Sequence, residues 1–182
     1  MPPELVEPAA LHHASFLAAL AEYHEDGIDT YLPVSHLARP DDFGRYLAAL
    51  RRAGEEGAPV TRDLAGAETV ASEVPQRVRW WPAGRHYVGR VRIALGLNDE
   101  LREYGGHIGF DIRPSERGRG HATALLAASL TAAEEWGLVE VLLTCAPDNH
   151  ASRRVIERNG GVLPDVSPAG RLRYWCRTIA DR

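Results

Sequence analysis

The sequence RPSERGRGHATALLAASLTAAEEWG spans residues 113–137 and places Arg-Gly-Arg-Gly directly before a run of alanine and leucine. The spacing of its apolar residues predicts a helix over about 118–136, which Gly137 ends. Glycine in the first turn of a helix costs up to about 1 kcal/mol relative to alanine. Gly118 and Gly120 therefore indicate that something comes close to the backbone: a tight turn, a packed neighbour or an anion.

A phosphate group is the anion that this loop fits best. The first turn of a helix offers unpaired N–H groups and the positive end of the helix dipole. Gly118 and Gly120 leave room for phosphate oxygens, and Arg117 and Arg119 can donate charge-assisted hydrogen bonds. The loop therefore predicts a phosphate-bearing cofactor, and close packing of the two glycines is the alternative interpretation.

Two common phosphate-binding loops do not match this one. A dinucleotide-binding fold requires a third glycine where Thr123 stands, and no acidic residue follows a second strand at the expected distance. All 21 basic residues are arginine, so a Walker lysine and a Schiff-base lysine are excluded.

The segments around the loop predict one α/β domain that covers residues 1–182. Residues 1–75 have helical periodicity, except for a long loop over 54–75, and the sheet and cofactor-binding core follow over 76–182. Within that core the pattern predicts strands at 76–81, 86–95, 107–113, 138–146 and 171–179, and a second helix at 149–159. We expect at least one parallel strand pair, with the ligand at the carboxyl ends of strands.

Composition and charge narrow the class of protein further. The chain has 182 residues, of which 45% are hydrophobic, and a net charge of −4. We expect a soluble cytoplasmic protein that binds no membrane, because no apolar run approaches the roughly 20 residues that span a bilayer. The negative net charge argues against a nucleic-acid partner. Cys145 and Cys176 are predicted to be buried thiols. His12 and His13 are predicted on a solvated helix face, and no spacing predicts a metal site.

The sequence is similar in two places to the GNAT superfamily of N-acetyltransferases. RGRGHA, residues 117–122, is similar to the Arg/Gln-x-x-Gly-x-Gly/Ala signature of that family, and FDIRPSERGRGHATALL resembles its strand-loop-helix. APDNHASRRVIERNGG, residues 146–161, resembles the Asn-x-x-Ser helix of the branch with the ribosomal-protein N-terminal acetyltransferases. The resemblance implies a GNAT-like mixed central β-sheet with helices on both faces and a helical N-terminal region. It also implies acetyl-CoA as cosubstrate.

In that family the coenzyme A pyrophosphate lies over the glycine loop, and the pantetheine arm lies along the preceding strand. The resemblance therefore implies a set of cofactor-binding residues: Phe110, Ile112, Arg113, Arg117, Gly118, Arg119, Gly120, His121, Ala122, Asn149 and Ser152. Asn149 and Ser152 would lie beside the thioester. Asn149 is equally expected as a helix N-cap.

Catalysis of acyl transfer to an amine needs a neutral amine and an acid for the departing thiolate. Many family members have a tyrosine as this acid where Ile156 stands here, and the branch resemblance implies Ser152 in its place. His107 has the intrinsic pKa of a base near neutrality, with a structural role as the alternative. Asp111 is a second candidate base or the partner of an arginine, and a water chain is the third possibility. Glu116 is expected to be solvated.

The acceptor is the least defined part of the prediction. Candidate walls of its pocket, or else core residues, are Trp80, Trp81, Tyr104, Tyr174 and Trp175, and only one of each adjacent tryptophan pair is expected to face inward. We expect a primary amine of a small molecule or peptide N-terminus, with a slight preference for a cation because the net charge is negative. The family also implies a homodimer.

Two other functions fit parts of the sequence. A catalytically silent sensor of acyl-CoA would explain the missing tyrosine at Ile156. A nucleic-acid-binding domain would use the arginines and tryptophans of the hairpin at 77–85, but an acidic chain favours an ordinary hairpin there.

Overall fold

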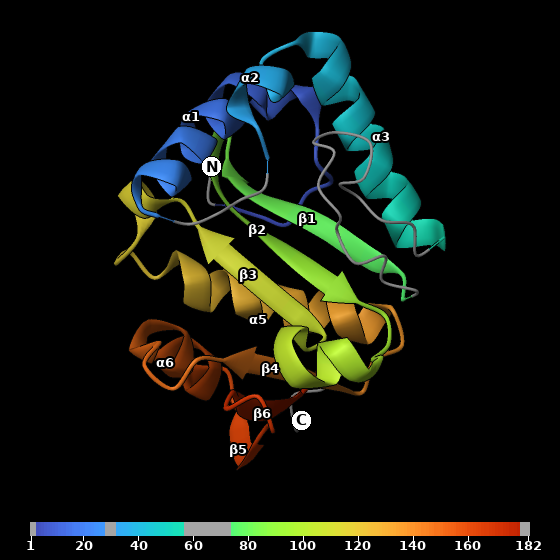
Figure 1. The fold of residues 1–182 in the computed structure, drawn as a ribbon, viewed down its shortest axis with the longest axis vertical. Helices are drawn as coiled ribbons and strands as arrows, with labels where there is room; N and C mark the ends of the chain where they lie inside the picture. Colours follow the sequence, from blue (N-terminus) through green and yellow to red (C-terminus); the bar gives the residue numbers. More distant parts are fainter. Residues whose placement is uncertain (1–2, 28–31, 57–73, 179–182) are drawn as a thin grey trace.

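A three-stranded antiparallel sheet forms the centre of the computed structural model, which describes residues 3–27, 32–56 and 74–178. Its strands, in spatial order, are β1 (Gln76–Ala83), β2 (His86–Ala94) and β3 (Ile108–Ile112). The predicted hairpin between β1 and β2 is confirmed, and Gly84 takes the positive φ of 61° that its tight turn requires. Figure 1 shows this sheet running through the middle of the molecule.

Helices from the N-terminal region cover one face of this sheet (Figure 1). They are a short 3-10 turn, η1 (Ala10–His12), followed by α1 (His13–Glu25), α2 (Val34–Leu37) and α3 (Pro40–Glu56). An aromatic core fills the space beneath them, where Phe16, Phe43 and Tyr87 pack around Trp80. The central part of the predicted loop at 54–75 lies outside the described residues.

The other face of the sheet packs against α5 (His121–Glu135). Trp81, Val91 and Ile93 contact Leu125 and Leu126 in this second core. Trp80 and Trp81 point to opposite faces of β1, and both are buried because each face is covered. The expectation that only one of the two tryptophans faces inward was therefore wrong.

A second three-stranded sheet, also antiparallel, occupies the C-terminal part of the chain. Its spatial order is β4 (Glu140–Cys145), β6 (Leu172–Arg177) and β5 (Val162–Val166). The helix α6 (His150–Arg158) follows β4, and two short helical turns flank β3: the π-helical η2 (Leu101–Gly105) and the 3-10 turn η3 (Pro114–Glu116).

The two sheets meet where β3 and β4 begin. His107, just before β3, donates its backbone N–H to the carbonyl oxygen of Leu142 at 2.7 Å. Figure 1 shows β3 and β4 pointing the same way and diverging toward their carboxyl ends. No parallel ladder joins them in the described residues, so the expected parallel pair exists only as this contact. The carboxyl ends of these strands are where the sequence predicts the ligand.

The prediction that His12 and His13 lie on a solvated helix face was wrong. His12 is buried and donates from Nε2 to the carbonyl oxygen of Gly84 at 3.1 Å. His13 donates from Nε2 to the carbonyl oxygen of Leu37 at 2.6 Å and stacks on Phe43. Both cysteines are buried free thiols, as predicted. Within the described ranges, every helix is too short or too polar to cross a bilayer.

Candidate active site

A cleft of about 630 Å³ lies between the end of β3, the start of α5 and one face of α6. Nine of the predicted cofactor-binding residues line it: Phe110, Ile112, Arg117, Gly118, Gly120, His121, Ala122, Asn149 and Ser152. Arg113 and Arg119 do not line it. Asp111 and Asn149 are 38 positions apart in the sequence. They line one cavity because α5 carries the chain from one sheet to the other.

The glycine loop lies at the wall of this cleft. The helix α5 begins at His121 and not near residue 118, because Gly118 and Gly120 have left-handed φ angles of 76° and 83°. A Cβ added at either glycine would meet nothing within 4 Å, so close packing does not explain them. The positive φ angles explain why glycine stands at both positions. The open space beside the two glycines belongs to the cleft.

The start of α5 is suited to an anion. No side chain of the described residues caps this helix, so its first three N–H groups have no acceptor within the helix or from such a cap. Those groups carry the positive end of the helix dipole. The residues present therefore fit the diphosphate of a nucleotide cosubstrate, as the sequence predicts.

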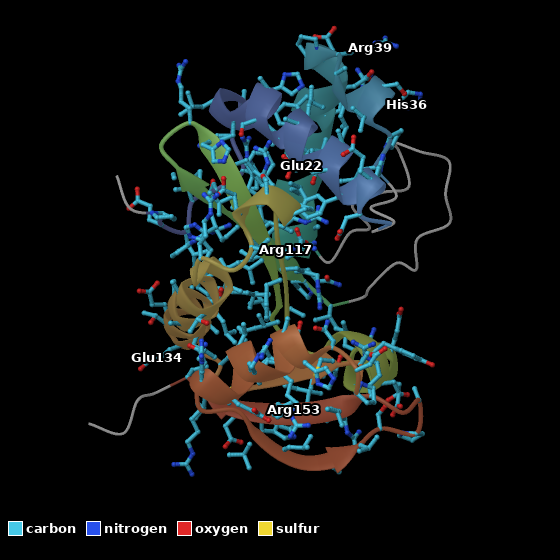
Figure 2. All side chains as sticks on the ribbon, turned by 90° about the vertical axis from the view of Figure 1, so that its left-hand side faces the viewer. Glu22, His36, Arg39, Arg117, Glu134 and Arg153 are labelled. Carbon is cyan, nitrogen blue, oxygen red and sulfur yellow. The ribbon has the colours of Figure 1, made fainter. Side chains whose placement is uncertain are left out.

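Acidic side chains pair with Arg117 and Arg119 of the loop, and also with Arg113 just before it. Arg117 donates from Nη1 to Asp26 Oδ2 at 2.7 Å, and Arg119 donates from Nη1 to Glu116 Oε2 at 2.8 Å. Glu116 also contacts Nε2 of His86 at 2.9 Å and is mostly buried, which corrects the expectation that it is solvated. In Figure 2 Arg117 lies between the N-terminal helices, where Glu22 is labelled, and the part of the molecule that carries Arg153.

Arg113 connects the N-terminal helices to the end of β3. It donates from Nε to Glu22 Oε1 at 2.7 Å, and its backbone N–H donates to the carbonyl oxygen of Val88. This arginine lowers the pKa of Glu22 to about 2. The structure thus gives Arg113 a role in holding α1 against the sheet.

The helix α6 supplies the opposite wall of the cleft. Asn149 accepts a hydrogen bond from the backbone N–H of Ser152 at 3.0 Å, which confirms its role as N-cap. Arg154 and Arg158 are exposed, line the cleft and form no ion pair within the described part of the chain. We did not predict these two arginines. Their spacing of four residues in SRRVIER, which places them on one face of a helix, was the available signal.

A second cavity, of about 300 Å³, opens on the other side of the diverging strands. Phe110, Asn149 and Ser152 line both cavities, so the two adjoin at these residues. The second cavity is bounded by η2, by the strands β2, β3 and β4, and by Arg171, which directly precedes β6. Ile156, where the family's usual tyrosine would stand, is buried in its wall.

His107 lines neither cavity. Its Nδ1 accepts the backbone N–H of Leu142 at 2.8 Å. Burial, together with the charges of Arg102 and Arg92, lowers the pKa of His107 to about 4. The neutral ring then carries its proton on Nε2 and has no free lone pair for a proton from substrate. The structure therefore favours the structural interpretation of His107 over the catalytic one.

Asp111 is paired with Arg90, whose Nε donates to Asp111 Oδ2 at 2.8 Å. This is the alternative that the sequence left open for Asp111. Burial, together with the nearby carboxylate of Asp111, raises the pKa of Tyr87 well above its ordinary value. This group of polar side chains lies beneath the N-terminal helices, and only Asp111 among them reaches the cleft.

The five aromatic candidates for the acceptor pocket divide between core and cavity. Trp80, Trp81 and Tyr174 are core residues. Trp175 packs edge-on against His107 at 6.2 Å between ring centroids. Tyr104 alone of the five lines the second cavity.

The comparison with known families defines the class of protein. Residues 31–162 match the family model described as an acetyltransferase (GNAT) domain. This match covers most of the chain, so the protein belongs to the GNAT acetyltransferases. The predicted family, fold class and enzyme class are thereby confirmed. No curated protein matches the sequence.

Solved structures share the fold at low sequence identity. RimJ of Mycobacterium smegmatis in complex with CoA-disulfide has 18% identity and a TM-score of 0.65, and the match covers 97% of this chain and 86% of that one. RimL, a ribosomal-protein alpha-N-acetyltransferase in complex with coenzyme A, has 13% identity and a TM-score of 0.63 over 97% and 94% of the chains. The microcin C7 self-immunity acetyltransferase MccE, in complex with acetyl-CoA and AMP, has 12% identity and a TM-score of 0.61 over 95% and 91%. Together with the family match, these complexes support acetyl-CoA as the predicted cosubstrate.

Proposed function

We propose that this protein transfers the acetyl group of acetyl-CoA to a primary amine of a small molecule or of a peptide N-terminus by direct attack. One observation carries the proposal: Asn149 and Ser152 line both the cleft beside the glycine loop and the cavity across the diverging strands. A donor in the first and an acceptor in the second would meet at these two residues.

The cleft would hold coenzyme A with groups of matching charge. The N–H groups at the start of α5 and the guanidinium of Arg117 would bind the diphosphate, since anions are stabilised at a helix N-terminus. Arg154 and Arg158 extend the positive charge along α6, where a further phosphate group would lie. The pantetheine arm would lie between Phe110 and Ile112 on one side and Asn149 on the other.

The reaction needs no covalent enzyme intermediate. The lone pair of a neutral amine forms a bond to the thioester carbonyl carbon, and the carbon–sulfur bond then breaks. The thiolate leaves with the electron pair and takes a proton, while the amine loses one, so the products are an amide and the free thiol. Cys145 and Cys176 are not used as nucleophiles, because burial raises the pKa of both thiols.

Ser152 is our candidate for the acid that protonates the thiolate. Among the hydroxyl-bearing residues that line the second cavity, it is the one that also lines the cleft. Its backbone N–H is fixed by Asn149, which places Ser152 in the first turn of α6. The base is left to a water chain, since His107 has no free lone pair and Asp111 is paired with Arg90.

Calorimetric titration with acetyl-CoA, with NAD and ATP as controls, tests the donor site. Thiol release with a panel of amines then tests the transfer. Binding of acetyl-CoA with amine-dependent thiol release supports the proposal. Binding without transfer to any amine would support the catalytically silent sensor, and no binding would refute both. A cytoplasmic location, a single domain and a homodimer stay predictions.

A further inference from the structure

The cavity across the diverging strands has an unbalanced positive charge. Of the described residues that line it, Arg92 and Arg171 are the only ones with a charged side chain. The remaining lining residues are apolar or neutral, from Ile108, Phe110 and Leu143 to Tyr104 and Thr144. Among the described lining residues, the cavity therefore has two arginines and no carboxylate.

These two arginines differ from the other partly buried arginines near the site. Arg90, Arg113 and Arg173 each donate to a carboxylate at 2.7 to 2.8 Å. Arg92 donates instead to neutral groups: from Nη1 to Gln76 Oε1 at 3.1 Å and from Nη2 to the carbonyl oxygen of Gly105 at 2.9 Å.

Arg171 likewise has only a neutral partner for its side chain, since its Nε donates to Thr144 Oγ1 at 3.3 Å. Neither Arg92 nor Arg171 forms an ion pair within the residues that the structure describes. Both side chains are only partly exposed. The carboxylate of Glu100 acts on Arg92 without forming an ion pair, and burial outweighs it, so the pKa of Arg92 is lowered. Withdrawing a cation from water without a paired counter-charge is costly, so a bound anion would stabilise this arrangement.

We propose that the acceptor is an anionic amine, with a carboxylate or phosphate group a few bonds from the amine, and that Arg171 binds this anion while Arg92 adds to the positive potential. This inference rests on the proposed transferase function, because it assigns the cavity to the acceptor. A volume of about 300 Å³ fits a small molecule or a terminal residue. The proposed anionic acceptor replaces the cationic acceptor that the net charge had favoured.

The same charges would help the chemistry. Nearby cations disfavour the protonated form of an amine and lower its pKa. A larger share of the amine would therefore be neutral and nucleophilic, and its proton would pass to the water chain. This agrees with a cavity in which no described lining residue is a carboxylate or histidine.

The test compares amines that differ only in the anionic group. Serine is compared with serinamide, O-phosphoethanolamine with ethanolamine, and spermidine serves as a cationic amine. Thiol release at saturating acetyl-CoA gives kcat/KM for each. We expect the anionic member of at least one pair to be preferred by about tenfold or more, the value of one charge-assisted hydrogen bond. The pair that shows the preference distinguishes a carboxylate from a phosphate.

Arg171→Gln should reduce this preference at least about fivefold, and Arg171→Glu should shift it toward spermidine. Arg177→Gln is the matched control, because Arg177 ends the strand β6 that Arg171 directly precedes, is exposed and is outside both cavities. Unchanged affinity for acetyl-CoA in all three variants shows that the fold and donor site are intact. Equal rates for charged and uncharged partners, or equal effects of the Arg171 and Arg177 variants, would overturn the proposal while leaving the transferase function standing.

If no amine is acetylated, the transferase function fails, and binding decides whether the anion site exists. Titration of the acetyl-CoA-loaded protein with O-phosphoethanolamine and serine, followed by NMR, should then show saturable binding that Arg171→Gln weakens. Ethanolamine and serinamide should not bind in this way. Absence of binding by either anionic amine would refute the anion site as well.

Discussion

Leu142 and His107 exchange two hydrogen bonds at the point where the two sheets meet. The backbone N–H of Leu142 donates to Nδ1 of His107 at 2.8 Å, and the backbone N–H of His107 donates to the carbonyl oxygen of Leu142 at 2.7 Å. Beyond this pair β3 and β4 diverge, and the two cavities adjoin in the space between them. The imidazole therefore fixes the point from which the candidate active site opens.

The first prediction concerns the pH dependence of stability at His107. Its pKa falls from an ordinary 6.5 to about 4 on folding, so the unfolded chain binds a proton in this window and the folded chain does not. The free energy of unfolding should decrease as pH falls below 6.5, by up to about 1.4 kcal/mol per pH unit. His107→Asn, whose Oδ1 can accept the same N–H, should lose this slope. Urea unfolding between pH 5 and 7 measures it.

The same variant tests the catalytic interpretation of His107. Because Nδ1 is occupied and the ring lies outside both cavities, the pH dependence of kcat/KM should keep its shape in His107→Asn. If kcat/KM of the variant no longer rose with pH while its affinity for acetyl-CoA was unchanged, His107 would be the base.

The second prediction separates backbone strain from cleft volume at the glycine loop. Gly120→Ala should cost about 1–2 kcal/mol of stability because φ is 83°, and its methyl group should also enter the cleft. Gly137→Ala is the matched control, since φ is 88°, nothing lies within 4 Å, and Gly137 is at the far end of α5. Calorimetry should show weaker acetyl-CoA binding for Gly120→Ala alone. Equal affinities would remove the loop from the donor site.

The strand, loop and helix around Gly118 were predictable because their signals are local. Alternating apolar residues define β3, and the apolar face of residues 122–133 defines α5. The helix start was misplaced by about three residues, since glycine letters alone do not show whether φ is negative or positive. The parallel pair was overestimated because the divergence of β3 and β4 depends on long-range packing that no local pattern encodes.

Roles set by distant partners were the ones that sequence could not supply. Arg113 is bound by Glu22, which is 91 positions away, and His12 by Gly84, which is 72 positions away. Such contacts exist only after the N-terminal helices pack on the sheet. Arg154 and Arg158 were missed for a different reason: exposed arginines on a helix are usually solvated, and only the cleft beside them gives them a role.

The third prediction concerns these two arginines. Arg154→Gln combined with Arg158→Gln should weaken binding of coenzyme A by about tenfold, since two exposed charge contacts are lost at roughly 0.5–1 kcal/mol each. Arg153→Gln is the control on the same helix, because Arg153 pairs with Glu157 and does not line the cleft. Titrations at two salt concentrations should show that the difference shrinks at high salt. If the double variant and Arg153→Gln lost the same affinity for coenzyme A, the phosphate groups would bind elsewhere.

The fourth prediction concerns the ion pair between Arg113 and Glu22. Arg113→Gln should lower stability by about 2 kcal/mol at pH 7, because it leaves a partly buried carboxylate without its partner. The pKa of Glu22 is lowered from 4.5 to about 2, so the contribution of the pair is complete above pH 4.5 and disappears as pH falls toward 2. Unfolding at pH 7 and pH 3 measures this. Affinity for acetyl-CoA should change less than about twofold, since Arg113 does not line the cleft.

The double variant Arg113→Gln with Glu22→Gln serves as the control for this pair. If the pair acts as a unit, the double variant should be no less stable than Arg113→Gln alone. Additive losses would show that the two residues stabilise the protein separately.

The last prediction concerns Ser152 as the acid for the leaving thiolate. Ser152→Ala should lower kcat by about 100-fold and change the affinity for acetyl-CoA by less than about twofold, because the hydroxyl would act only as the carbon–sulfur bond breaks. Ser152→Thr keeps a hydroxyl at the junction of the two cavities and should recover most of the rate. Asn149→Ala should instead cost about 1 kcal/mol of stability through loss of the N-cap. If kcat is unchanged in Ser152→Ala, the thiolate takes its proton from water and Ser152 serves only the first turn of α6.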